Sequence, residues 1–298
     1  MRKGDFLTLL NLLKENAGWE FNETQYFIID KKINNFIREK HYNSVDDLMD
    51  DLQNGNKTLI SQVVEALTFS DTSFFRNFDV FYQFENSILP KLKEKCRASK
   101  KLNIWSLGCS TGQEAYSIAM SIDNNSKMFS DWNINILASD LSSLAISKAQ
   151  HGAYSNFEIQ TGLNAKTILK YFTQSDDEWI ISDKIKKMIE FRKYNLLDEA
   201  IVKSKFDVIF CRNVLRYFTH ELQDLLLKRI SEKQPQGGYL YLGKGENILP
   251  VEKYYQKIDN NGTYMAIGST RPDTSSGNLS VSSSDEDALP SFVKPHGL

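Results

Sequence analysis

The 298-residue sequence has few cysteines and few histidines, and it has no apolar run as long as a membrane span. Its three cysteines are widely separated and odd in number, and its four histidines form no metal-ligand spacing with them. We therefore expect a reducing compartment and no metal site. The missing apolar run predicts a cytoplasmic protein without direct membrane insertion. Positive charge is not in excess, since the formal net charge is −2, so nucleic acid is not an expected partner.

The chain is long enough for two domains, and residues 1–78 carry the apolar spacing of amphipathic helices. Asp5 and Asn11 interrupt the first apolar run, which favours a helix over a signal peptide. Ser44 precedes acidic residues and is typical of a helix N-cap. We predict an all-α N-terminal domain at 1–78, followed by a linker helix at 79–101.

Basic side chains gather on a predicted helix at 31–40 within this domain. Lys31, Lys32 and Arg38 give the helix a positive face on a nearly neutral protein. One interpretation is an ordinary solvated surface, and the other is electrostatic docking of an acidic partner.

The central stretch at 104–120 is predicted to be a strand, a small-residue turn and a helix. The strand-like pattern stops before Gly108, and Gly112 precedes apolar residues at helical spacing. Glycine gives such a turn the backbone freedom to pass close to a ligand, and the helix start offers unpaired N–H groups. A buried turn without a ligand is the alternative, because two glycines are weaker evidence than three regularly spaced ones.

Strands and helices alternate after this stretch, which predicts an open, mainly parallel α/β sheet. The next strand, at 134–140, ends in Asp140, an acid placed to accept hydrogen bonds from ribose hydroxyls. It lies about thirty residues after the turn rather than the ~20 of a dinucleotide fold, which favours a nucleoside cofactor over NAD. Further strands are expected at 189–197, 206–211, 239–243, 254–258 and 263–267. Arg212 and Asn213 follow one of them and should face the same crevice as Gly108 and Asp140.

Two segments depart from this alternation. Residues 153–190 combine aromatic, acidic and lysine-rich clusters, and we predict a small inserted β-subdomain on the rim of the sheet. Residues 269–298 are rich in serine and poor in apolar side chains, so we expect a disordered tail, in which 289–293 could be a short docking motif.

Four motifs in order, TSFFR at 72–76, WSLGCSTGQEAYS at 105–117, ASD at 138–140 and FCRNVLRYF at 210–218, resemble the chemotaxis receptor methyltransferases, the CheR family. The resemblance covers residues 1–268. It implies a Rossmann-like methyltransferase domain at 102–268 with an open, mostly parallel seven-stranded sheet and S-adenosylmethionine as cofactor, converted to S-adenosylhomocysteine. The implied reaction is methyl esterification of glutamates on the cytoplasmic helices of chemoreceptors by a monomer.

The family motifs also imply site residues. Arg76 and Tyr217 would be catalytic, with Tyr217 orienting the incoming carboxylate; Arg76 would neutralise the carboxylate of either the cofactor or the substrate. Lys31, Lys32 and Arg38 would dock the receptor. Glu114 would receive the cofactor's ammonium, Asp140 its ribose, and Asn195 with Leu196 its adenine. The full set of implied cofactor contacts is Ser70, Thr72, Arg76, Gly108, Gly112, Glu114, Asp140, Asn195, Leu196, Arg212 and Asn213.

The chemistry agrees with the absence of a recognisable catalytic triad or paired-carboxylate site. A glutamate is already an anion at neutral pH, since its reference pKa is about 4.3, so methyl transfer to it needs no general base. The sequence departs from the family pattern at Ser70, Ala115, Arg216 and 243–247, which puts substrate preference in doubt more than cofactor binding. A related methyltransferase acting on another protein or a small acid, and a non-catalytic cofactor-binding scaffold, remain the alternatives.

Overall fold

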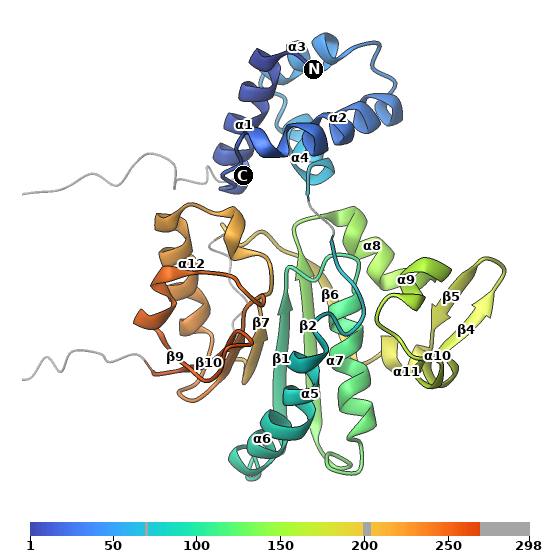
Figure 1. The fold of residues 1–298 in the computed structure, drawn as a ribbon, viewed down its shortest axis with the longest axis vertical. Helices are drawn as coiled ribbons and strands as arrows, with labels where there is room; N and C mark the ends of the chain where they lie inside the picture. Colours follow the sequence, from blue (N-terminus) through green and yellow to red (C-terminus); the bar gives the residue numbers. More distant parts are fainter. Residues whose placement is uncertain (69–70, 199–203, 269–298) are drawn as a thin grey trace, which may run out of the picture.

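The computed structural model describes residues 1–68, 71–198 and 204–268, so Ser70 and the expected tail at 269–298 lie outside the described residues. The chain forms a helical unit at one end, a central twisted sheet below it, and a small second sheet at the side (Figure 1). Within the described ranges, no helix is long and apolar enough to span a bilayer.

The helical unit is built from four α-helices with their own apolar core. Leu9, Leu13, Ile33, Leu48 and Val63 are fully buried in this core. The predicted cap at Ser44 is confirmed, because its hydroxyl accepts a hydrogen bond from the Asp47 N–H at 3.1 Å. The elements are α1 (Lys3–Ala17), the 3-10 turn η1 (Glu23–Gln25), α2 (Tyr26–Lys40), α3 (Val45–Gln53) and α4 (Lys57–Ala66).

A helical rod packs against the central sheet and ends shortly before the first strand of that sheet (Figure 1). It consists of α5 (Phe78–Gln83), a π-helical turn η2 (Phe84–Ile88) and α6 (Leu89–Lys95), within the stretch where a linker helix is expected at 79–101. The π turn places Phe84 against Phe210 of the sheet, with ring centroids 5.3 Å apart. The helix therefore widens to a π turn at the point where it packs against the sheet.

The central sheet has seven strands in the order β6-β2-β1-β7-β8-β10-β9. The pairs β1–β2, β2–β6, β1–β7 and β7–β8 are parallel, and β10 is antiparallel to β8 and β9. The predicted Rossmann-like methyltransferase fold is therefore confirmed. The strands are β1 (Lys101–Leu107), β2 (Asn133–Asp140), β6 (Ile189–Lys193), β7 (Val208–Phe210), β8 (Tyr239–Tyr241), β9 (Tyr255–Lys257) and β10 (Thr263–Ala266).

The prediction of a strand over 189–197 is wrong in its second half. The strand ends at Lys193, and the Asn195 side chain accepts the Leu197 N–H at 3.0 Å, which turns the chain out of the sheet. This turn brings Asn195 and Leu196 to the crevice described below.

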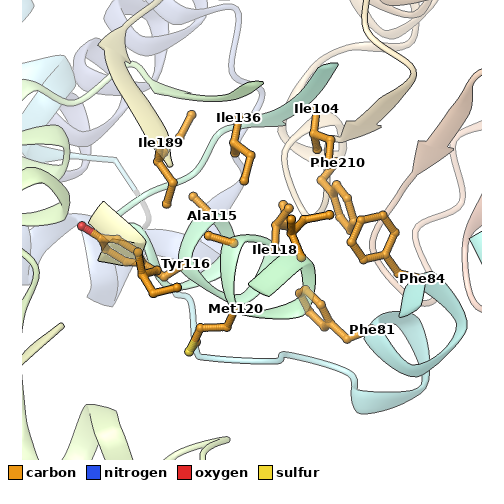
Figure 2. Packing of buried hydrophobic residues seen from close by; sticks show 14 of the residues in the cluster. Phe81, Phe84, Ile104, Ala115, Tyr116, Ile118, Met120, Ile136, Ile189 and Phe210 are labelled. Carbon is orange, nitrogen blue, oxygen red and sulfur yellow. The ribbon is translucent and has the colours of Figure 1, made fainter. Parts of the chain in front are cut away.

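Helices cover both faces of the sheet. On one face, α7 (Gln113–Asn124) presents Ala115, Ile118 and Met120 between the strands and the helical rod (Figure 2). On the other face, α12 (His220–Glu232) and the 3-10 turn η4 (Leu249–Lys253) pack on a second core that includes Trp105 and Leu240. Apolar burial on both sides fixes the position of the strand ends.

The inserted segment forms its own antiparallel sheet in the order β3-β5-β4 (Figure 1). Its base is anchored to α7, because Tyr171 donates a hydrogen bond to Asp123 at 2.8 Å and Lys170 pairs with the same carboxylate at 3.2 Å. The elements of this region are α8 (Ser143–His151), β3 (Ala153–Ser155), α9 (Asn156–Gln160), α10 (Ala165–Tyr171), β4 (Phe172–Ser175), β5 (Glu178–Ile181) and α11 (Asp183–Lys186).

Candidate active site

A cleft at the carboxyl ends of β1, β2 and β7 brings together most of the residues singled out from the sequence. Gly112 is not among the lining residues, and neither are Lys31, Lys32 and Arg38 on α2, although Lys32 donates a hydrogen bond to the carbonyl of the lining residue Thr68 at 2.7 Å. The predicted residues that line it are Thr72, Arg76, Gly108, Glu114, Asp140, Asn195, Leu196, Arg212, Asn213 and Tyr217.

The two glycines of the first turn have different surroundings. Gly108 has a φ of +75°, and a Cβ added to it would lie 2.4 Å from Val214 Cγ2. Gly112 has a φ of +95°, and its added Cβ would lie 2.8 Å from the Ala149 Cβ. Gly108 therefore allows the loop after β7 to close over the turn, whereas Gly112 allows α7 to start close to α8.

Asp140 closes the turn from the end of β2. One carboxylate oxygen accepts the Ser110 N–H at 2.8 Å and the other accepts the Ser142 N–H at 2.9 Å. Burial raises the pKa of Asp140 above its usual value, and the backbone N–H groups of Ser142, Ser110 and Leu141 partly oppose that shift. The carboxylate is thus fixed in orientation, with one lone pair on each oxygen left for a ligand.

Glu114, on the first turn of α7, is held in a buried polar network. It accepts a hydrogen bond from the Ser106 hydroxyl at 2.8 Å and pairs with Arg212 at 3.2 Å. Ser106 is fully buried, so this serine within an apolar strand has a defined partner. The network places a carboxylate of known orientation beside Gly108 in the cleft.

Arg212 anchors the 71–77 loop, which leads into α5. Its side chain is 2% exposed and donates to the Arg76 carbonyl at 2.7 Å and the Asn77 side chain at 2.6 Å. Arg76 itself donates to the backbone oxygen of Asp71 at 2.6 Å and pairs with its carboxylate at 2.9 Å. Arg212 therefore connects β7 to the 71–77 loop as well as lining the cleft.

Glu246 organises the loop after β7, a role that the sequence did not reveal. One of its oxygens accepts the backbone N–H groups of Asn213, at 2.8 Å, and Gly243. Asn213 has a φ of +61°, which this pair of bonds supports. Burial raises the pKa of the Glu246 carboxyl. Residues 243–247 depart from the family pattern, but they include Glu246, the acid that holds this loop.

Tyr217 is held by a segment of the N-terminal helical unit. The Glu20 N–H donates to the Tyr217 carbonyl at 2.7 Å, and Trp19 forms a β-bridge with Phe218. The Phe21 ring packs edge-on against the Tyr217 ring with centroids 5.8 Å apart. The helical unit therefore contributes directly to the cleft rather than only standing beside it.

Comparison with known proteins identifies the family. Residues 70–263 match the family model described as CheR methyltransferase, SAM binding domain. The chain belongs to the CheR methyltransferase family. Chemotaxis protein methyltransferase 1 of Pseudomonas aeruginosa is 31% identical over 258 residues, covering 85% of this chain and 94% of that protein.

Other relatives agree with the CheR assignment. The chemotaxis protein methyltransferase of Borreliella burgdorferi is 32% identical over 256 residues, covering 83% of this chain and 89% of that protein. Among solved structures, a TehB-like SAM-dependent methyltransferase from Corynebacterium glutamicum aligns with 55% of this chain and 78% of that chain, at 12% identity and a TM-score of 0.33, too low a score to define a shared fold. This CheR-family chain is a methyltransferase that uses S-adenosylmethionine.

Several lining residues of this CheR-family site were missed from the sequence. Ala17 and Trp19 come from the end of α1 and the turn after it, far from the methyltransferase motifs. The aromatic residues around Glu20, directly after the helix-ending Gly18, are the available signal in the sequence. The other unpredicted lining residues are Thr68, Asp71, Leu107, Ser110, Leu141, Tyr194, Val214, Arg216 and Phe218.

Proposed function

We propose that this CheR-family methyltransferase forms methyl esters on glutamate side chains of chemoreceptor cytoplasmic helices. The observation that supports this most is the convergence of Glu114, Asp140 and Tyr217 on one cleft in a chain of this family. The relatives' names point to chemotaxis. Chemoreceptor helices would therefore be the partner, met in the cytoplasm.

The cleft fits S-adenosylmethionine in charge and hydrogen bonding. Asp140 retains acceptor capacity toward the two ribose hydroxyls, because each oxygen accepts one backbone N–H. Glu114 would hold the cofactor's ammonium, sharing its carboxylate with Arg212. The carbonyl of the Asn195 side chain is used by Leu197, so its amide N–H₂ is left for the adenine, and Leu196 would supply the apolar contact.

S-adenosylmethionine supplies an electrophilic methyl group on a positively charged sulfur. The chain's own part would be positioning: proximity and orientation can lower a barrier by up to about 7–11 kcal/mol. Tyr217 would orient the substrate carboxylate, while Trp19, Leu107 and Phe218 make the cleft partly apolar. Opposite charges cancel during the transfer, so a partly dry cleft favours it.

The basic face of α2 would dock the acidic receptor, with different roles for its cations. Lys31 and Arg38 are exposed, and Arg38 donates to the Asn34 carbonyl at 3.2 Å. Lys32 is half-buried and donates to the Thr68 carbonyl at 2.7 Å, and burial lowers its pKa. Lys31→Glu with Arg38→Glu therefore tests docking without breaking the Lys32 contact: receptor methylation should slow while cofactor affinity stays unchanged.

The substrate is tested by incubating the protein with methyl-labelled S-adenosylmethionine and receptor fragments. Base-labile label on receptor glutamates supports the proposal. Label confined to another protein or to a small acid overturns it in favour of a related methyltransferase. Calorimetry that shows no binding of S-adenosylmethionine or S-adenosylhomocysteine favours a scaffold role instead.

A further inference from the structure

Arginine side chains surround the cleft, and they differ in how far their charge is neutralised. Arg212 is buried and paired with Glu114 at 3.2 Å. Arg76 is paired with Asp71 at 2.9 Å. Arg216 also lines the cleft; the charges of Glu246 and Asp71 act on it, yet among the described residues it forms no ion pair within 4.0 Å. Its guanidinium is thus the cleft arginine whose charge is left for a ligand.

Arg216 is held beside the tyrosine expected to orient the substrate. Its Nη2 donates a hydrogen bond to the Tyr217 hydroxyl oxygen at 3.0 Å, and its guanidinium carbon lies 5.0 Å from the centre of the Tyr217 ring. An arginine is cationic at every physiological pH. The hydrogen bond therefore keeps a positive charge in a fixed relation to Tyr217.

The direction of this hydrogen bond determines what the pair can bind. Because the Tyr217 oxygen accepts from Arg216, the Tyr217 O–H proton is directed away from the guanidinium. Arg216 has five N–H groups, and among the described residues only the bond to Tyr217 uses one of them. A hydroxyl donor and a guanidinium side by side suit a carboxylate, which has two acceptor oxygens and a negative charge.

We infer that Arg216 and Tyr217 together bind the carboxylate of the substrate glutamate, and that Arg216 is the residue that distinguishes glutamate from glutamine. This inference rests on the proposed function. Glutamine has the same shape as glutamate but is neutral and offers a single acceptor oxygen, so it loses the ionic contact. Arg216 is exposed, which limits the value of such a contact to at most about fivefold in affinity.

Arg216→Met tests the inference, with Arg97→Met as a matched control. Arg97 is 79% exposed on the segment after α6 and does not line the cleft. Binding is measured by calorimetry on protein saturated with S-adenosylhomocysteine, using receptor fragments that carry either glutamate or glutamine at the methylated positions. We expect the unmodified protein and Arg97→Met to bind the glutamate form up to about fivefold more tightly, and Arg216→Met to bind both forms alike.

Kinetic measurements distinguish binding of the substrate carboxylate by Arg216 from a role in which Arg216 only holds Tyr217 in place. Arg216→Met should raise KM for the receptor with little change in kcat or in the affinity for S-adenosylhomocysteine, and Arg216→Lys should restore part of the glutamate preference. A variant Arg216→Met that keeps the full binding preference for the glutamate form, or that lowers kcat on that form with no change in KM, overturns the inference alone. If the unmodified protein methylates no receptor fragment, the proposed function and this inference both fail.

Discussion

The cleft has two walls that are built in different ways. The cofactor wall, residues 108–114 with Asp140, is formed by two neighbouring parallel strands: the N–H groups of Gly108 and Cys109 both donate to the Ser139 carbonyl, at 2.8 and 2.9 Å. The substrate wall, residues 214–218, depends in part on a distant segment. Glu20, in the helical unit, holds Tyr217, and the nearby Gln223 amide donates to the Leu215 and Phe218 carbonyls at 3.2 and 3.0 Å.

This difference indicates that cofactor binding and substrate positioning are separable. The cofactor wall belongs to the buried sheet, so its geometry follows from strand pairing. The substrate wall takes part of its support from the helical unit, which is also the proposed docking unit for the receptor. Changes in the helical unit should therefore affect catalysis while leaving cofactor affinity intact.

Gly108→Ala should have the largest effect, because it acts where the two walls meet. The new Cβ would lie 2.4 Å from Val214 Cγ2, and overpacking of this kind costs about 1–3 kcal/mol. The left-handed φ of +75° adds about 1 kcal/mol. Denaturant unfolding should show this loss, and Gly108→Ala combined with Val214→Ala should recover the steric part. An unchanged free energy of unfolding would mean that Gly108 and Val214 are not in close contact.

Asp140→Ala should affect the cofactor wall alone. Loss of hydrogen bonds to a charged group should weaken S-adenosylmethionine binding by about 1.5–3 kcal/mol, roughly tenfold to over a hundredfold. Calorimetry measures this directly, and the affinity of the cofactor-saturated variant for a receptor fragment should be unchanged. Undiminished cofactor affinity would remove Asp140 from the site.

Phe21→Ala should affect the substrate wall alone, by a smaller amount. An aromatic pair such as Phe21 with Tyr217 contributes about 0.5–1.5 kcal/mol, so kcat should fall about twofold to tenfold while the affinity for S-adenosylmethionine stays the same. Phe21→Tyr should keep most of the activity. Leu7→Ala serves as the control in the same unit, since Leu7 is 46% exposed on α1. Equal kcat values for Phe21→Ala and Leu7→Ala would show that Phe21 of the helical unit does not position Tyr217 for catalysis.

The smallest of the expected effects, near neutral pH, is the pH dependence of cofactor affinity. Ribose hydroxyls bind the carboxylate form of Asp140, and the raised pKa makes protonation begin at a higher pH than for an ordinary aspartate. Affinity should therefore decrease as pH falls toward that pKa, and Asp140→Asn should lose this part of the profile. The pH dependence of folding stability has the opposite sign. The stability that the raised pKa of Asp140 contributes is fully present below the pKa of the unfolded state, and it is lost as pH rises through the pKa of the folded state. Identical profiles for both proteins would contradict the assignment.

The cofactor wall could be predicted from the sequence because its signals are local. The strand, turn and helix at 104–120 and the acid at Asp140 follow from apolar periodicity, and the seven-stranded sheet follows from the alternation of elements. The motif order also identified the family. Strand ends were less certain, since the side-chain turn at Asn195 competes with continued pairing after Lys193.

The substrate wall could not be predicted in the same way because long-range contacts define it. Nothing in the sequence near Tyr217 indicates that Glu20 and Phe21 lie against it. Glu246 was noticed only as part of a variant motif, and its role depends on a backbone N–H of Asn213 that is distant in sequence. Arg212 was expected to face the cofactor, but its bond to the Arg76 carbonyl depends on how the 71–77 loop folds back.

The most direct test is tandem mass spectrometry of a receptor fragment after incubation with S-adenosylmethionine and the protein, with Asp140→Ala in parallel. We expect methyl esters on glutamate side chains of the fragment, and far fewer with the variant at limiting cofactor. Methyl groups on nitrogen atoms, or an unmodified fragment in the presence of cofactor-binding protein, would contradict the proposed function.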